Sequence, residues 1–358
     1  AVLSLRERGE KEAKSPAVHA RSPHFPSCKF WLKTLQFLKM CEVDRMTVLE
    51  RKVEGPAVSE GIRLPGKYFN LEKTFECGQA FRWRRLDTAL SDATEMTYEG
   101  IASNRYLRVR QTPGHVILET SWEAFDSFWR AYFDLDTDYA AIEQILLERD
   151  PSSAMACAAE FGRGIRILRQ DPWEMVITFI LSGNNNIPRI KGSIEALSQR
   201  FGSDICVEAG GCSRFEGFKE MKGFPAAEVL AGLGLDDYRQ AGAGYRDQYL
   251  LATAQKVASG EADLAAWGHL EDTALMKALL TLPGVGEKVA SCIMLFGYGR
   301  RAAFPVDTWV AKMMRQLYFN HEASAKEIKT FAELRFGDQA GYAQQLLFHW
   351  GRNSEMEA

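Results

Sequence analysis

The hydrophobic pattern of this chain changes once, near residue 121, and that change limits the architectures it can adopt. Between about residues 62 and 120, β-forming residues alternate or cluster in short segments. Asn104 and the pair Pro113-Gly114 interrupt them as turn signals. The strand-like segments span residues 81–84, 97–101, 106–110 and 116–118. This part of the chain therefore predicts a small antiparallel sheet.

After Ser121, a good helix N-cap, apolar residues recur at helical spacing to the end of the chain. Asp171-Pro172 is typical of an N-cap followed by proline at the first helical position. Helices are expected over residues 187–201, 245–258, 272–280, 288–296, 308–317 and 340–349. The predicted fold class is α+β, with an N-terminal antiparallel sheet domain over residues 46–135 and a mainly helical body over 136–358.

Residues 1–45 differ in composition from the rest. They hold nine basic and five acidic side chains and contain Ser-Pro twice. Their apolar stretch, residues 30–40, is interrupted by Lys33 and Lys39, so it does not have the form of a signal-peptide core. We expect a disordered leader, with Met46 as the natural start.

Composition excludes several classes of protein. With 46% hydrophobic and 25% charged residues among 358, the chain is neither collagen-like nor disordered, and no apolar run is long enough to cross a bilayer. The net charge of −3 argues weakly against nucleic acid, because a whole-chain charge averages over opposite faces. The seven cysteines are scattered without metal-ligand spacing, so we expect reduced thiols and no metal.

The segment 282–290, Leu-Pro-Gly-Val-Gly-Glu-Lys-Val-Ala, lies between two helical patterns. Gly284 and Gly286 allow a tight turn with positive φ at both residues and a close backbone approach. The N-terminus of the second helix then faces this turn, where its N–H groups can bind phosphate. Gly284, Val285 and Gly286 are thus candidate contacts to a nucleic-acid backbone. A plain hairpin of two helices explains the glycines equally well.

Two charged residues follow this turn. Lys288 lies in the first turn of the second helix, where the helix dipole disfavours a cation and so favours an amine that reacts as a nucleophile. Asp307 follows nineteen residues later in Pro-Val-Asp and can stabilise a developing sugar cation. Taken singly, Lys288 is explained as an exposed helix lysine and Asp307 as a helix N-cap.

Together these segments resemble the helix-hairpin-helix DNA glycosylases, and more closely the 8-oxoguanine DNA glycosylase/lyase branch. The resemblance covers roughly residues 62–350. It implies that Lys288 attacks C1′ of the damaged nucleotide and that Asp307 stabilises the reacting sugar.

The resemblance also implies a pocket for the flipped base. The segment 77–83, Cys-Gly-Gln-Ala-Phe-Arg-Trp, resembles one whose glycine carbonyl, here that of Gly78, accepts the N7–H of 8-oxoguanine. Cys292 and Phe348 would sandwich the base, and Gln344 would contact its Watson–Crick edge. Without the resemblance, Cys292 and Phe348 are ordinary core residues.

Two further segments resemble parts of the family that fill and read the opened duplex. In Asn-Asn-Asn-Ile-Pro-Arg, residues 184–189, the asparagine segment, with Asn184 as a DNA contact, would fill the space left by the flipped base. Asn185 would lie in the gap itself, and Arg189 would bind the opposite cytosine. In Gly-Tyr-Arg, residues 244–246, Tyr245 would wedge into the duplex and Arg246 would also bind the cytosine.

The sequence departs from the pattern at Trp309, where animal and fungal members have a histidine that contacts phosphate; Lys312 is a candidate substitute. The four-cysteine cluster of the thymine-glycol branch is absent, and Lys288 argues against the alkyl-purine branch. Two alternatives stay open: a glycosylase of another helix-hairpin-helix branch, acting on an alkylated or other oxidised base, and a non-enzymatic helix-hairpin-helix DNA-binding protein.

The expected function is excision of oxidised purine, chiefly 8-oxoguanine opposite cytosine, followed by a β-elimination nick. The expected partner is double-stranded DNA containing a damaged base, and no cofactor, metal or membrane is implied. We expect a monomer in the bacterial cytoplasm, associated with the nucleoid, or in the nucleus if the source is eukaryotic.

Overall fold

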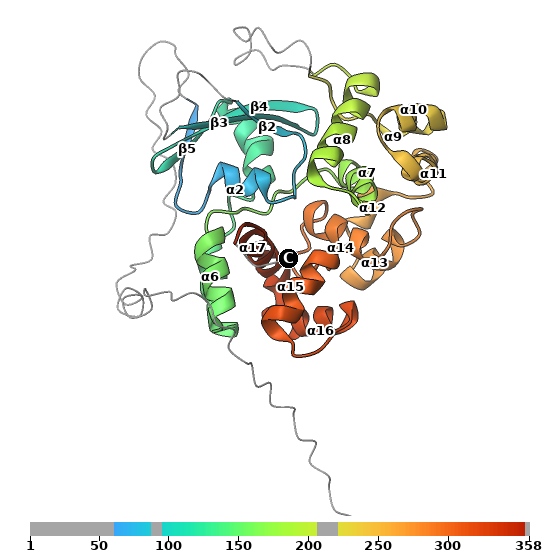
Figure 1. Ribbon diagram of the computed structural model, residues 1–358. Helices are drawn as coiled ribbons and strands as arrows, with labels where there is room; N and C mark the ends of the chain where they lie inside the picture. Colours follow the sequence, from blue (N-terminus) through green and yellow to red (C-terminus); the bar gives the residue numbers. More distant parts are fainter. Residues whose placement is uncertain (1–60, 87–94, 206–220, 355–358) are drawn as a thin grey trace, which may run out of the picture.

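A computed structural model describes residues 61–86, 95–205 and 221–354. An antiparallel five-stranded sheet comes first and a mainly helical body follows, which confirms the predicted α+β class (Figure 1). The leader expected over residues 1–45 and the start expected at Met46 lie outside the described residues. The division at residues 135 and 136 remains a prediction.

The sheet has the strand order β1-β5-β4-β3-β2, and every neighbouring pair is antiparallel. Its strands are β1 (Ile62–Pro65), β2 (Trp83–Leu86), β3 (Met96–Ala102), β4 (Arg105–Thr112) and β5 (His115–Leu118). Strand β2 begins two residues after the predicted segment, and β1 was not predicted. β1 has only Ile62 and Leu64 as buried apolar residues, so its alternation is too short to identify it from sequence.

The predicted turns are confirmed. Ser103 and Asn104 have φ of 46° and 62°, and Gly114 has φ of 79°, so each turn uses the left-handed region. The Asn104 Oδ1 also accepts the N–H of Phe224 at 3.0 Å, which ties this end of the sheet to the helical body.

One face of the sheet is covered by short helices that complete an apolar core. Phe75, from the helix α2 (Leu71–Glu76), stacks on Trp83 with ring centroids 4.2 Å apart. The Trp83 indole N–H donates to the Tyr132 hydroxyl at 2.8 Å. Tyr132 belongs to a continuous helical segment made of α3 (Trp122–Ala124), η1 (Phe125–Trp129) and α4 (Arg130–Tyr132). This segment begins at the N-cap Ser121, as predicted.

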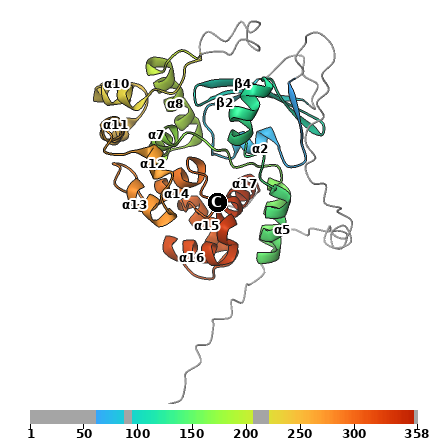
Figure 2. The ribbon, with the colours of Figure 1, turned by 180° about the vertical axis from the view of Figure 1, so that it is seen from behind.

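The helical body surrounds a second, larger core. Its helices are α5 (Tyr139–Arg149), α6 (Ser153–Gly162), α7 (Pro172–Ser182), α8 (Ile187–Phe201), α9 (Ala227–Ala231), α10 (Leu235–Gln240), η3 (Gly244–Arg246), α11 (Asp247–Ala258), α12 (Leu264–Trp267), α13 (Asp272–Leu279), α14 (Glu287–Phe296), α15 (Thr308–Tyr318), α16 (Ala325–Phe336), η4 (Gly337–Gln339) and α17 (Ala340–Asn353). Helices α8 to α11 form a lobe beside the sheet, α12 to α16 lie below that lobe in Figure 1, and α17 packs against α6 (Figures 1 and 2).

Helix α7 is the central helix of this body. Asp171 caps it through a 2.9 Å bond from the Glu174 N–H, and Pro172 is its first residue, as predicted. All of its residues from Glu174 to Leu181 are buried, and it contacts α14 along its length. The C-terminus of α7 at Ser182 is therefore held in a fixed position next to the start of α14.

The helix predicted over residues 245–258 is divided in the structure. Residues Gly244–Arg246 form a 3-10 turn, and the α-helix begins at Asp247. Gly244 has φ of 58°, a conformation that an α-helix does not contain, so the helix starts only after this turn. None of the helices in the described ranges combines the length and apolar character that crossing a membrane requires.

Candidate functional site

A cavity of about 60 Å³ opens where α7, α14, α15, α17 and the turn after α2 meet. Most of its lining residues were singled out from the sequence, although they come from segments far apart in the chain. It is lined by Cys77, Gly78, Phe179, Lys288, Cys292, Phe296, Pro305, Asp307, Gln344, Gln345 and Phe348. The structure thus brings together both predicted catalytic residues and all the predicted base-binding residues.

Lys288 lies in the first turn of α14 and extends toward the end of α7. Its Nζ donates to the Ser182 Oγ at 3.0 Å and lies 5.7 Å from the centroid of the Phe179 ring. The neighbouring Glu287 turns outward, where Lys329 binds it at 2.7 Å and lowers the pKa of its carboxyl. The acidic neighbour is therefore engaged outside the cavity, and the amine alone enters it.

Asp307 serves as the N-cap of α15. One of its carboxylate oxygens accepts the Val310 N–H at 2.7 Å, which confirms the N-cap expected from sequence. The same side chain lines the cavity with Lys288. A cap bond fixes a carboxylate in one orientation, so the structural role and a chemical role are compatible in this residue.

Cys292 lies one helical turn after Lys288 and is buried. Burial raises the pKa of its thiol, the negative charge of Asp307 raises it further, and the Lys288 amine acts in the opposite direction. Burial has the largest effect, so the thiol is neutral near pH 7 and presents a soft, apolar surface to the cavity.

Phe348 forms another wall and is supported from behind by an aromatic ring. Trp309 meets it in an edge-to-face contact with centroids 5.5 Å apart and an interplanar angle of 81°. Trp309 also packs so closely on α17 that a Cβ on Gly351 would lie 2.6 Å from the indole ring. Trp309 therefore supports Phe348 through packing.

Gly78 forms the edge of the cavity on the sheet side. Its φ of 84° is a left-handed conformation, and a Cβ there would lie 3.3 Å from Ile187 and 3.6 Å from Phe348. The next residue, Gln79, is buried, and its amide donates to the carbonyls of Thr74 and Arg166 at 2.9 and 2.7 Å. This amide fixes the turn so that its backbone faces the cavity.

Gln344 and Gln345 lie side by side on α17 and are both buried. The Gln345 amide N–H donates to the Gln344 side-chain oxygen at 2.7 Å, which fixes the Gln344 side chain at the cavity wall. Gln345 was not predicted, because consecutive helix residues usually point to different faces.

The residues predicted to fill and read the duplex form a second cluster outside the cavity. The Arg246 guanidinium is buried and bonds the carbonyls of Gly183 and Asn184, the latter at 3.1 Å. Tyr245 is 62% exposed and stacks beside it, with the guanidinium 4.3 Å from its ring centroid. Contact of Arg246 with a base therefore requires these carbonyl bonds to rearrange.

The asparagine segment is held by its own backbone. Asn184 has φ of 49° and is exposed. The Asn185 amide donates to the Leu181 carbonyl at 3.0 Å, and Asn186 caps α8 by accepting the Arg189 N–H at 3.0 Å. The Arg189 side chain is exposed, so it can reach DNA without rearrangement.

The hairpin between α13 and α14 has the expected tight turn, with one correction. Gly284 has φ of 80°, but Gly286 is extended with φ of −95° and is the N-cap of α14. No heavy atom lies within 4 Å of a Cβ built on Gly286. Because Gly286 has no side chain, a ligand can reach the N-terminus of α14, where the first backbone N–H groups have no partner within the helix.

Ser182, Phe179 and Trp309 are site residues to which sequence reasoning assigned no role at the cavity. Each contacts a predicted site residue only through the tertiary fold, and no local spacing indicates such a contact. Across the described ranges, no group of three or more His, Cys, Asp or Glu side chains is arranged to hold a metal ion.

The chain is similar to known proteins over most of its length. Residues 62–176 match the 8-oxoguanine DNA glycosylase N-terminal domain, and residues 177–336 match the HhH-GPD superfamily base excision DNA repair protein. The N-glycosylase/DNA lyase OGG1 of Arabidopsis thaliana is 30% identical over 80% of this chain and 78% of its own length.

Solved structures share the fold over most of the chain. MBOgg1 in complex with a low-affinity DNA ligand has a TM-score of 0.74 at 36% identity, covering 85% of this chain and 99% of that one. The Clostridium acetobutylicum 8-oxoguanine glycosylase/lyase has a TM-score of 0.72 at 38% identity, covering 80% and 92%. The chain belongs to the 8-oxoguanine DNA glycosylase family of helix-hairpin-helix glycosylase/lyases that act in base excision repair.

Proposed function

We propose that this protein excises 8-oxoguanine paired with cytosine from duplex DNA and then nicks the strand. The observation that carries the proposal is the convergence of Lys288 and Asp307 on one cavity with Gly78, Cys292 and Phe348. The Clostridium acetobutylicum relative was solved with double-stranded DNA containing cytosine opposite 8-oxoguanine, which supports this choice of substrate.

The cavity accounts for capture of the base. A nucleotide extruded from the duplex leaves its stacking partners, at a cost of a few kcal/mol, and regains contacts between Cys292 and Phe348. Phe348, which is partly exposed, is the wall with most room to move.

The chemistry follows from the two charged side chains. The Lys288 amine attacks C1′ through its lone pair, the bond from C1′ to the base breaks, and the base leaves with the electron pair and takes up the proton that the amine gives up. Asp307 stabilises the positive charge that develops on the sugar during this step. The C1′–O4′ bond then breaks, O4′ takes up the remaining amine proton, and C1′ is left as an imine with Lys288. Loss of a proton from C2′ then expels the 3′ phosphate by β-elimination.

Borohydride trapping tests this mechanism directly. An 8-oxoguanine:cytosine duplex incubated with the protein and borohydride should give a covalent adduct, because borohydride reduces the imine to a stable amine. Lys288→Gln should abolish excision and adduct while leaving DNA binding within a few-fold, whereas Lys277→Gln, an exposed lysine on α13, should retain both. An active wild-type protein that gives no adduct would exclude Lys288 as the nucleophile.

Asp307→Asn separates catalysis from folding. The asparagine side-chain oxygen can still accept the Val310 N–H, so the helix cap and the melting temperature should be kept. The excision rate should fall by about a hundredfold or more because the carboxylate charge is lost.

We expect the protein to act as a monomer on DNA, in the bacterial cytoplasm or in a eukaryotic nucleus.

A further inference from the structure

The last residue of α7, Ser182, makes two hydrogen bonds that order the amine of Lys288. Its Oγ donates to the Phe179 carbonyl at 2.8 Å and accepts from the Lys288 Nζ at 3.0 Å. The two bonded residues lie 106 positions apart in the chain. No role for Ser182 follows from the sequence.

The direction of these bonds has a chemical consequence. A serine hydroxyl has one donor and two lone pairs, and the Phe179 carbonyl occupies the donor. Ser182 can therefore only accept a hydrogen from Lys288. A neutral amine bound in this way uses an N–H and keeps its lone pair unbound, whereas a hydroxyl that was free to rotate could donate into that lone pair and block attack.

We infer that Ser182 is a positioning residue, which holds the Lys288 amine by an N–H so that its lone pair points into the cavity. The inference deepens the proposed function and rests on it, since it concerns Lys288 as the nucleophile. The Phe179 ring and the Cys292 thiol limit the other directions available to the amine. Because α7 is buried along its length, the Ser182 hydroxyl is a fixed reference point for the long lysine side chain.

The test is single-turnover excision of an 8-oxoguanine:cytosine duplex by Ser182→Ala at saturating enzyme. We expect the excision rate constant to fall by about tenfold to a hundredfold, the range for a misplaced reacting group. The dissociation constant for the uncleaved duplex should stay unchanged, because Ser182 acts on the amine. Ser182→Thr retains a hydroxyl and should recover most of the rate.

A matched control removes an equivalent bond elsewhere. Ser259, at the C-terminus of α11, donates to the Lys256 carbonyl at 3.1 Å, with the same three-residue spacing as Ser182 and Phe179. It is exposed and lies outside the cavity lining. Ser259→Ala should therefore excise at the wild-type rate.

The outcomes separate the inference from the proposed function. If the wild-type protein is active and Ser182→Ala excises the base at the same rate, the inference is overturned and the proposed function is left intact. Equal losses of rate, DNA affinity and melting temperature in both Ser182→Ala and Ser182→Thr would also overturn it, by showing a structural role. A wild-type protein that neither excises the base nor forms an adduct would refute the proposed function, and the inference with it.

Discussion

Gly284 and Tyr249 are in such close contact that a Cβ on Gly284 would lie 2.8 Å from the Tyr249 Cβ. Tyr249 of α11 follows shortly after the exposed Tyr245 of the preceding 3-10 turn. One helical turn after Tyr249, Thr253 donates to the Pro283 carbonyl at 3.1 Å. The helix that follows the candidate wedge therefore packs directly on the hairpin. The two parts of the molecule that are expected to contact DNA are held in a fixed relation.

Gly284→Ala should destabilise this junction. The new methyl group would meet Tyr249, and alanine is strained at the φ of 80° found there. We expect the free energy of unfolding to fall by about 1–3 kcal/mol, measured by denaturant unfolding. Unchanged stability would show that the helix and the hairpin are not rigidly packed.

Gly286→Ala in the same hairpin should leave stability nearly unchanged and weaken DNA binding instead. Its φ is not left-handed and a Cβ there meets nothing within 4 Å, so we expect the unfolding free energy to change by less than about 1 kcal/mol. The methyl group would nevertheless stand at the N-terminus of α14, where phosphate is expected to approach. DNA affinity, measured by fluorescence anisotropy, should fall, and unchanged affinity would argue against a backbone contact there.

Trp309→Ala should loosen the cavity wall. Phe348 would lose its edge-to-face partner, and such pairs are worth about 0.5–1.5 kcal/mol beyond their buried area. We expect KM for the lesion duplex to rise by roughly twofold to tenfold in Trp309→Ala. In Trp309→Phe, which keeps an aromatic ring, KM should stay close to the wild-type value. If both variants match wild type, Phe348 does not depend on this support.

The parts of the site that could be predicted from sequence rest on local rules. Asp307 was expected as a helix cap and Lys288 in the first turn of a helix because capping and helix starts depend on nearby residues. Ser182 and Trp309 could not be identified as supports, because their contacts join distant segments and leave no periodic signal. The family resemblance identified Arg246 as a DNA contact. The hydrogen bond from its buried guanidinium to the Gly183 carbonyl depends on the tertiary fold and could not be predicted.

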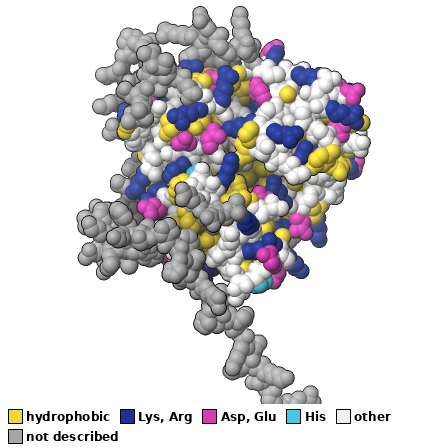
Figure 3. All heavy atoms as spheres, viewed as in Figure 1, with side chains coloured by type: hydrophobic (Ala, Val, Ile, Leu, Met, Phe, Trp, Pro, Cys, Tyr) yellow, Lys and Arg dark blue, Asp and Glu magenta, His cyan; other side chains and the backbone are white. Residues whose placement is uncertain are grey.

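Binding to DNA should depend only weakly on salt. Two of the basic residues that follow the hairpin in the chain are already paired, Arg300 with Asp272 at 3.4 Å and Arg315 with Glu322 at 3.3 Å. Lys and Arg side chains are interspersed with acidic and neutral ones on the face shown in Figure 3. We expect a slope of log K against log salt of about −2 to −4, and a slope near −10, as for a strongly basic repressor, would contradict this.

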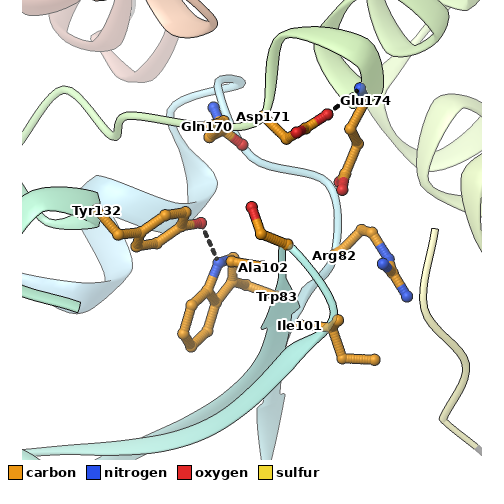
Figure 4. Close-up of a pocket in the computed structure, with 9 residues that line it drawn as sticks. Arg82, Trp83, Ile101, Ala102, Tyr132, Gln170, Asp171 and Glu174 are labelled. Atoms are coloured by element: carbon orange, nitrogen blue, oxygen red, sulfur yellow. Dashed lines mark hydrogen bonds between the residues drawn. The ribbon is translucent and has the colours of Figure 1, made fainter. Parts of the chain in front are cut away.

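A buried carboxyl lies where the sheet meets the helical body. Glu174 of α7 lines a small cavity with Arg82 and Asp171, and its carboxylate points toward Arg82 (Figure 4). Burial raises the pKa of Glu174 from 4.5 to about 7, the Arg82 guanidinium opposes this, and the Asp171 charge adds to it. At neutral pH the folded protein thus holds this proton far more tightly than the unfolded chain does.

The stability of the protein should therefore fall as pH rises from about 4.5 to about 7 and stay level above that range, as far as Glu174 contributes. Below the unfolded pKa both states are protonated and no penalty exists; above the folded pKa both are ionised and the penalty is complete. Glu174→Gln removes the ionisable group, so it should exceed wild type at pH 8 by up to about 3 kcal/mol and match it near pH 4.5. Urea unfolding at the two pH values measures this difference, with the exposed Glu228→Gln on α9 as the control. Equal stability of Glu174→Gln and wild type at both pH values would show that the carboxyl ionises in the folded protein without cost, because the charge of the Arg82 guanidinium offsets its burial.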